Sequence, residues 1–186
     1  MGKTPFKVPV DQIGVDGFAL DVTLPHSWLE ESLFGEPPSE KGSAVRPEGD
    51  GHLTIRLTRV GDKVYARGGV RVALVGSCAR CLDAAMLVLD RDIEVALWPS
   101  GKEPAASGDG EVQVEDMGIS TYEDRAIDLA NLVRDEVFLA LPMRPLCRET
   151  CAGLCPHCGG NRNLDKCACS APMDPRWAAL AQHGSG

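Results

Sequence analysis

Alternation of hydrophobic and polar residues predicts a β-hairpin in the middle of the chain. From residue 53 onward apolar side chains occupy every second position of a first strand, and Gly61-Asp62 then marks a tight turn. A second strand continues the alternation and carries Tyr65, Arg67 and Arg71 on its polar face. Gly68-Gly69 predicts a bulge within it. The apolar face of the hairpin is Leu53, Ile55, Leu57, Val64, Ala66, Val70, Val72 and Leu74.

Weaker patterns predict further elements on either side of this hairpin. Residues 6–10 and 18–24 are expected to be extended, residues 27–34 helical, and residues 86–98 a third long strand. Asp128 is a suitable N-cap for a helix that ends at Pro142, and a short final helix is expected to begin at Asp174. The main helix should bury one face, because its apolar residues recur every three or four positions: Leu129, Leu132, Val133, Val137, Ala140 and Leu141.

Two segments show no hydrophobic period and are expected to be mobile. Residues 35–50 and 99–116 are rich in Gly, Ser, Pro and charge and contain little that could be buried. The chain of 186 residues has room for one domain and a small appendage. We therefore predict an α+β domain over residues 1–143 and a cysteine-rich tail over residues 144–186. Its sheet should be antiparallel, open or closed into a barrel, with one main helix packed on it.

The eight cysteines need an explanation that fits the compartment. The longest apolar run, residues 84–89, is too short to cross a bilayer, and the first ten residues lack the apolar core of a signal peptide. We therefore expect a cytoplasmic protein without membrane contact, in which thiols stay reduced. Disulfides and inert buried thiols remain alternatives, but metal binding is the favoured interpretation.

The cysteine spacing is typical of zinc sites. Two pairs have the two-residue spacer that lets one tight turn present two sulfurs to a single ion. Gly159 follows the second pair and can take the positive φ that turns the chain away, whereas Leu82 follows the first. Zinc is favoured over iron–sulfur on this spacing. The eight candidate ligands are Cys78, Cys81, Cys147, Cys151, Cys155, Cys158, Cys167 and Cys169.

Eight thiols can fill two tetrahedral sites. The preferred division places Cys155, Cys158, Cys167 and Cys169 in one site, and joins Cys78 and Cys81 to Cys147 and Cys151 in the other. In the alternative division Cys147, Cys151, Cys155 and Cys158 form one group. His157 could also replace a cysteine, although an exposed spacer is its simpler interpretation.

Sites filled by four cysteines have no open position for water and indicate a structural role. The chain also lacks a Ser-His-Asp arrangement, a Walker loop and a Rossmann glycine pattern, and its four histidines are scattered. We therefore expect neither an enzyme nor a protein with a small-molecule substrate.

Charge is distributed unevenly along the chain. The formal net charge of −8 argues against a generally basic nucleic-acid binder, but residues 51–82 carry six Lys or Arg and one acid. An aromatic ring beside guanidinium groups on one sheet face suits base stacking and phosphate contact, although a solvated outer face is the alternative. The candidate RNA contacts are Arg56, Tyr65, Arg67, Arg71 and Arg80.

Three separated motifs connect the chain to a known family. They are CARCL after a strand, the helix DLANLVRDEVFLALP, and PLCRETCAGLCPHCGGNRNLDKCAC followed by DPRWAAL. In this order they resemble the YceD-like family, the large ribosomal RNA subunit accumulation proteins of bacteria and plastids. The likeness covers about residues 50–182. It implies a non-enzymatic factor for accumulation or maturation of large-subunit ribosomal RNA, with the cysteines as its hallmark.

Three functions are therefore expected in order of preference. The first is a ribosome-assembly factor, stabilised by two zinc ions, that contacts large-subunit ribosomal RNA or a pre-ribosomal particle. The second is a protein-interaction module that binds a basic ribosomal protein through the acidic segment 99–124, without direct RNA contact. The third is a thiol-based redox or metal sensor, motivated by the cysteine density.

Overall fold

The chain folds into two compact units, which are described separately. The computed structural model describes residues 6–34, 45–102, 119–165, 167–169 and 176. Unit 1 comprises Met1–Gly76 and Met86–Met143, and unit 2 comprises Ser77–Ala85 and Arg144–Gly186. The first cysteine pair therefore belongs to the same unit as the C-terminal tail. The helix predicted from Asp174 lies outside the described residues.

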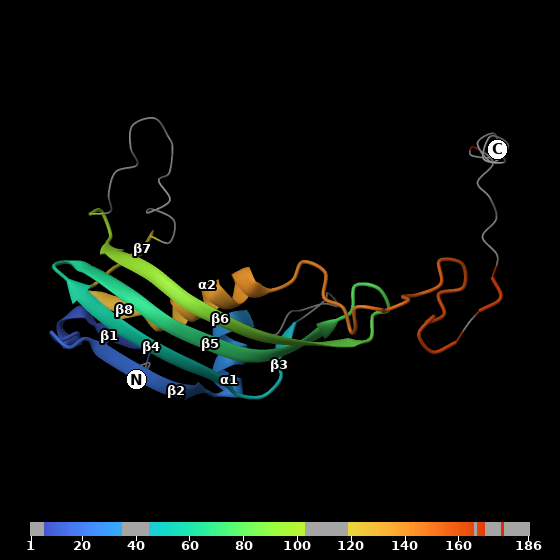
Figure 1. Cartoon of the computed structure of the whole chain (residues 1–186), viewed down its shortest axis with the longest axis horizontal. Helices are drawn as coiled ribbons and strands as arrows, with labels where there is room; N and C mark the ends of the chain where they lie inside the picture. Colours follow the sequence, from blue (N-terminus) through green and yellow to red (C-terminus); the bar gives the residue numbers. More distant parts are fainter. Residues whose placement is uncertain (1–5, 35–44, 103–118, 166, 170–175, 177–186) are drawn as a thin grey trace. The chain divides into compact units, whose positions relative to one another are not determined.

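A six-stranded sheet forms the framework of unit 1 (Figure 1). Its strands follow the order β2 (Phe18–Leu24), β4 (Gly51–Val60), β5 (Lys63–Ser77), β6 (Ala84–Pro99) and β7 (Ile119–Tyr122). The short β3 (Arg46–Pro47) pairs with β5 beyond the end of β4. Strands β2 and β4 are antiparallel to their partners, whereas β7 runs parallel to β6.

The sheet is open, so the barrel alternative is wrong. Among the described strands, β2 and β7 stand at opposite ends of the strand order and do not pair with each other. Closure would require β7 to reach β2, but β7 has four residues and pairs only with residues 96–99 of β6. The expectation of a purely antiparallel sheet also fails at this strand.

The central hairpin has the predicted faces. All eight residues assigned to its apolar face are at most 1% exposed, and they belong to the hydrophobic core of unit 1. On the opposite face Arg56, Arg67 and Arg71 are exposed, and Tyr65 is partly buried. Period-two alternation was sufficient here because an antiparallel sheet with one wet face separates odd and even residues completely.

The bulge predicted at Gly68-Gly69 is wrong. The register of β4 and β5 is continuous from His52↔Arg71 to Val60↔Lys63, with no extra residue on either strand. Glycine is required at position 68 for a different reason. A Cβ there would overlap the carbonyl oxygen of Thr54 and lie 2.7 Å from the Cα of Ile55, so the two backbones approach too closely for any side chain.

Helical elements and a second small sheet complete the core of unit 1. Helix α1 (His26–Leu29) continues as a π-helical turn, η2 (Glu30–Phe34), over the segment predicted to be helical. Helix α2 (Leu129–Ala140) begins at its predicted cap, where the Asp128 carboxylate accepts hydrogen bonds from the backbone N–H groups of residues 130 and 131. In the described part of the chain, neither helix is long and apolar enough to cross a membrane.

Short strands are the main features that the sequence did not predict. Strand β1 (Lys7–Pro9), followed by a 3-10 turn at Val10–Gln12, pairs with β8 (Ala126–Asp128), which was not predicted. Strand β7 was also missed. Strand β3 lies within a segment predicted to be mobile, so that prediction is wrong at Arg46–Pro47. Strand β6 also extends to Pro99, and residues 35–44 and 103–116 of the two predicted mobile segments lie outside the described residues.

The close approach of β4 and β5 generates a first prediction. We expect Gly68→Ala to lower the free energy of unfolding of unit 1 by at least about 1–3 kcal/mol, because the new methyl group must push two strand backbones apart. Gly69→Ala is the matched control, since its Cβ would lie 3.3 Å from the Arg91 carbonyl oxygen and 4.0 Å from Asp92 Oδ1, with no overlap. Denaturant unfolding monitored by circular dichroism compares the two variants. Equal stability of both would contradict the close-approach explanation.

Candidate metal centre

Unit 2 gathers all eight cysteines into two groups of four. One consists of Cys78, Cys81, Cys147 and Cys151, and the other of Cys155, Cys158, Cys167 and Cys169. Within each group all four sulfur atoms lie within 4.8 Å of one another, and each group could hold a metal ion. These are the groups of the preferred division. The members of the alternative group, Cys147, Cys151, Cys155 and Cys158, fall into two different clusters.

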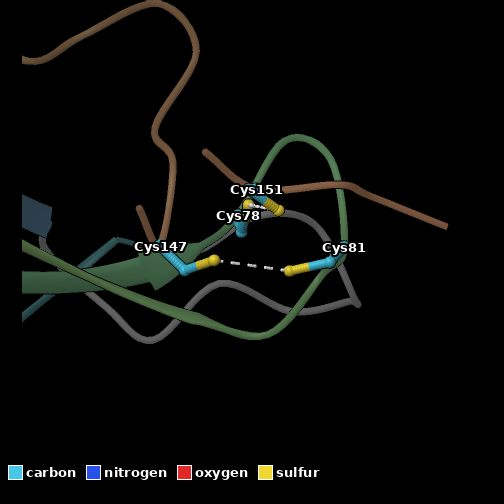
Figure 2. A group of neighbouring side chains, drawn as sticks. All are labelled: Cys78, Cys81, Cys147 and Cys151. Carbon is cyan, nitrogen blue, oxygen red and sulfur yellow. Dashed lines mark hydrogen bonds between the residues drawn. The ribbon is translucent and has the colours of Figure 1, made fainter. Parts of the chain in front are cut away.

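The spacing of the sulfurs fits a tetrahedral zinc ion. In the first group Cys78 Sγ lies 3.8 Å from Cys151 Sγ, and Cys81 Sγ lies 3.6 Å from Cys147 Sγ (Figure 2). Four sulfurs about 2.3 Å from a central zinc would be separated by about 3.8 Å along each edge of the tetrahedron. A disulfide would need about 2.05 Å. The side chains in Figure 2 come from two distant segments and point toward one another.

The two Cys-x-x-Cys turns share one backbone conformation. In the first, the N–H of Leu82 donates to the carbonyl of Cys78 at 3.0 Å; in the second, the N–H of Gly159 donates to that of Cys155 at 2.9 Å. Both donors have positive φ, 66° at Leu82 and 71° at Gly159. Leu82 therefore adopts the left-handed conformation that usually requires glycine. The absence of glycine made the first motif look weaker in sequence than it is in structure.

Backbone N–H groups favour the ionised form of one sulfur in each turn. Burial raises the pKa of Cys78, but hydrogen bonds from the backbone N–H groups of Cys147, Arg80 and Cys81 outweigh it and lower that pKa to about 6. The backbone N–H groups of Cys158 and His157 likewise lower the pKa of Cys155 to about 6. Such bonds are the usual support of a metal-bound thiolate.

The remaining sulfurs show why these groups suit a cation. Burial raises the pKa of Cys81 and of Cys147, and the neighbouring Cys158 thiol raises the pKa of Cys169 to about 12. Four thiolates so close together repel one another, so they cannot all ionise without a compensating charge. A divalent cation would supply that charge. The donor set of each group therefore fits zinc.

Arg80 holds two segments of unit 2 together. Its guanidinium donates to the carbonyl of Cys151 at 2.8 Å, and its own carbonyl accepts the N–H of Leu154 at 3.0 Å. Gly153 has φ 72°, and a Cβ there would lie 3.1 Å from the Arg80 carbonyl oxygen. Arg80, predicted as an RNA contact, thus orients a cysteine-bearing segment in this structure.

Two asparagines that the sequence reasoning missed support the first group. The side chain of Asn163 donates to Cys151 Sγ at 3.3 Å, and this bond is the main cause of the lowered pKa of Cys151. The side chain of Asn161 donates at 2.7 Å to the Asp83 carboxylate, which accepts a bond from Cys81 Sγ at 3.4 Å. Both asparagines follow the second cysteine turn, in the sequence NRN, and that position was the only available signal.

The two groups differ in exposure. Cys78, Cys81 and Cys151 are at most 3% exposed and form a small buried cluster with Ala85. In the second group only Cys155 is buried, and the other three cysteines are exposed. His157 is exposed and belongs to neither group, as expected of a spacer residue.

The other predicted RNA contacts lie on the outer face of the sheet of unit 1. Arg56 and Arg67 are direct cross-strand neighbours, but Arg67 pairs with Glu94 at 2.8 Å and Arg71 with Asp90 at 3.1 Å. The Nζ of Lys63 lies 4.8 Å from the ring centroids of both Tyr65 and Trp98. Trp98 is therefore a second aromatic residue near Tyr65, and the sequence reasoning did not include it.

The left-handed conformation of Leu82 generates a second prediction. Because its side chain is 67% exposed and contributes little packing, Leu82→Gly should remove the backbone strain and stabilise unit 2 by about 1 kcal/mol. Leu164→Gly is the matched control at a 77% exposed position without positive φ, and it should be neutral or destabilising. Unfolding in the presence of zinc measures both. Destabilisation by Leu82→Gly would refute this account of the turn.

Comparisons with known proteins identify the same family as the three sequence motifs. A family model described as "Large ribosomal RNA subunit accumulation protein YceD" matches residues 66–182. An uncharacterized protein of Mycobacterium tuberculosis is 35% identical over 130 residues, which are 70% of this chain and 60% of that protein. A second one, from Mycobacterium leprae, is 30% identical over 129 residues, 69% of this chain and 57% of that protein.

A plant protein carries a functional name. The "Large ribosomal RNA subunit accumulation protein YCED homolog 1, chloroplastic" of Arabidopsis thaliana is 32% identical over 137 residues, 63% of this chain and 43% of that protein. The chain spans about three fifths of the length of the mycobacterial relatives. No solved structure matches it. From the extent of the family match, together with the three motifs and the two cysteine groups, the chain belongs to the YceD family of large ribosomal RNA subunit accumulation proteins.

Proposed function

We propose that this protein is a non-enzymatic factor that promotes accumulation or maturation of large-subunit ribosomal RNA, with a C-terminal unit built on two structural zinc ions. The observation that carries the proposal is the pair of four-sulfur groups in a chain of this family. Each group already has the four protein ligands of a closed site, which suits a structural ion and leaves no position for a substrate. The proposal places the protein in the compartment that holds the ribosomes, the cytoplasm of a bacterial cell.

Zinc is supported by the composition of the described core of unit 2. Among the described residues, the buried cluster around the first group consists of Cys78, Cys81, Cys151 and Ala85, with Leu146, Cys147 and Leu154 packed against it. This described cluster by itself buries too little apolar surface to stabilise a fold. A structural zinc ion contributes about 10–16 kcal/mol of binding free energy, which is also folding free energy where the unfolded chain has no site.

Metal content gives the third prediction. Protein purified without added metal should contain two zinc ions per chain by elemental analysis. Cys81→Ser and Cys158→Ser should each lower the count to about one, because they remove a ligand from different groups. His157→Ala is the control and should keep two ions, since this exposed histidine belongs to neither group. A wild-type count near zero would refute the zinc proposal.

A chelator extends the same experiment to folding. Removal of zinc from the full chain should abolish the dispersed NMR signals of unit 2 while those of unit 1 persist, because unit 1 has its own hydrophobic core. The second group should lose its ion first, since three of its cysteines are exposed. Loss of both ions without any change in the signals of unit 2 would contradict a structural role.

RNA contact is proposed on the outer sheet face, between Arg56 in the middle of β4 and the β4–β5 turn. Arg56 forms no ion pair with any described residue, and Lys63 lies over two aromatic rings there. Cations beside Tyr65 and Trp98 suit a single-stranded segment, whose phosphates and bases need both kinds of group. Arg71 contributes less in this proposal because its charge is balanced by Asp90.

The salt dependence of RNA binding gives the fourth prediction. Arg56→Ala should weaken binding of large-subunit RNA fragments and lower the slope of log affinity against log salt by about 0.7–0.9, the loss of one phosphate contact. Arg91→Ala is the control, an exposed arginine on β6 that forms no ion pair with a described residue. Filter binding over a salt series measures both. Equal effects of the two variants would remove the proposed patch.

A protein-interaction module is the second candidate, and one observation favours it. Two of the five predicted RNA contacts, Arg67 and Arg71, are paired with acids, and Arg80 donates to a backbone carbonyl of unit 2. The cationic surface left for RNA is therefore small. Association with ribosomal particles that survives nuclease treatment would favour this candidate over direct RNA contact.

A further inference from the structure

In the part of the chain that the structure describes, one edge of strand β2 is unpaired along its whole length. It stands at the end of the strand order and pairs with β4 over seven residues, from Phe18↔Leu57 to Leu24↔Gly51. In the described part of the chain no strand pairs with its other edge (Figure 1). A free edge of this length offers unpaired backbone N–H and C=O groups, and proteins usually cover such edges or use them to bind an extended segment.

An apolar groove lies beside this edge. It has a volume of about 260 Å³, and the rings of Phe6 and Trp28 lie in it with centroids 4.3 Å apart. Leu20 and Val22 of β2 line it and are only half-buried, although they point to the core side of the sheet. The groove is smaller than the roughly 300–1,000 Å³ of typical small-molecule sites. It is therefore suited to a few aliphatic side chains.

The segment that contains β2 is acidic, although Arg56 of β4 lies directly opposite Ala19. Described residues 6–34 contain five acids and a single lysine. Asp21 stands on the outward face of β2 and is exposed, with His52 as its only ion-pair partner among the described residues. Asp16, directly before β2, and Glu30 and Glu31, after Trp28, are exposed and form no ion pair with a described residue. A partner for this edge should therefore be basic.

We infer that the edge of β2 binds an extended segment of a partner protein in which basic and aliphatic residues alternate. Cross-strand neighbours share one face of a sheet. Residues of the added strand opposite Leu20 and Val22 therefore enter the groove and are aliphatic, whereas residues on the face of Asp21 are Lys or Arg. Backbone hydrogen bonds to β2 supply affinity, and the alternation supplies specificity. Neither proposed function uses this surface, so the inference stands apart from RNA binding and from the acidic segment 99–124.

Synthetic peptides test this inference on the full-length protein. The probe is a nine-residue peptide that alternates Lys and Val, and the comparison peptide alternates Lys and Ser. The Lys/Val peptide should bind in calorimetry and shift the NMR amide signals of β2, whereas the Lys/Ser peptide should bind at least about tenfold more weakly because it cannot fill the groove. A Lys/Val peptide N-methylated on alternate residues should lose binding, because it cannot pair with the edge.

Two variants with the same substitution locate the site. Val22→Thr replaces one methyl group in the groove and should weaken the Lys/Val peptide about fourfold, with unchanged RNA affinity. Val88→Thr is the control on β6, where the side chain is 65% exposed and outside the groove, and it should leave peptide affinity unchanged. Circular dichroism confirms that both variants are folded. Equal binding of the Lys/Val and Lys/Ser peptides, or equal effects of the two variants, would overturn the inference.

Discussion

Electrostatic repulsion between neighbouring cysteine thiolates is the constraint on which the two four-cysteine groups of unit 2 depend. Cys81 and Cys147 are 66 residues apart in sequence, yet their sulfurs lie 3.6 Å from each other. Bringing these two segments together costs loop-closure entropy, and a bound ion would offset that cost. The cost is modest even for a long loop, because it rises by only about 0.6 kcal/mol for each doubling of loop length. A divalent ion would also compensate the burial and the mutual repulsion that disfavour ionisation of all four thiols. The asparagine and backbone donors around Cys151 and Cys78 then fix the orientation of the sulfurs.

The described cores of the two units differ in composition, so we expect different conditions to destabilise each unit. Unit 1 buries a continuous set of aliphatic side chains between the sheet, α2 and the segment α1–η2. Its stability depends on close packing. At Gly68, for example, the backbone lies so close to β4 that no side chain can be accommodated. Unit 2 buries cysteines and little else in its described part. If the two groups hold metal as proposed, its fold would respond to metal supply and to oxidation of its exposed thiols, whereas the core of unit 1 would not.

The elements predicted correctly from the sequence are those with long and regular patterns. Long alternating strands and the Asp128-capped helix were predicted correctly, because period and capping are local properties. Short strands such as β7 and β8 carry too few residues to show a period, and their pairing depends on distant partners. The division of the cysteines followed from spacing. The contribution of Asn163 did not, because an amide that orients a sulfur has no spacing rule of its own. Gly68 was assigned to the wrong cause, since a bulge and a close backbone approach leave the same residue in a sequence.

The distribution of charge on the sheet of unit 1 would allow the proposed RNA contact despite a net charge of −8. Ion pairs such as Arg67–Glu94 balance the middle of the outer face, so long-range attraction of phosphate is weak there. Among the described residues, Arg56 in the middle of β4 and Lys63 beside the β4–β5 turn form no ion pair, and neither do Asp16, Glu30 and Glu31 before and after β2. Like charges repel as effectively as opposite charges attract, so the acidic edge disfavours RNA as it favours a basic segment. If both proposed contacts form, the charge of each surface would therefore contribute to specificity by disfavouring the ligand of the other.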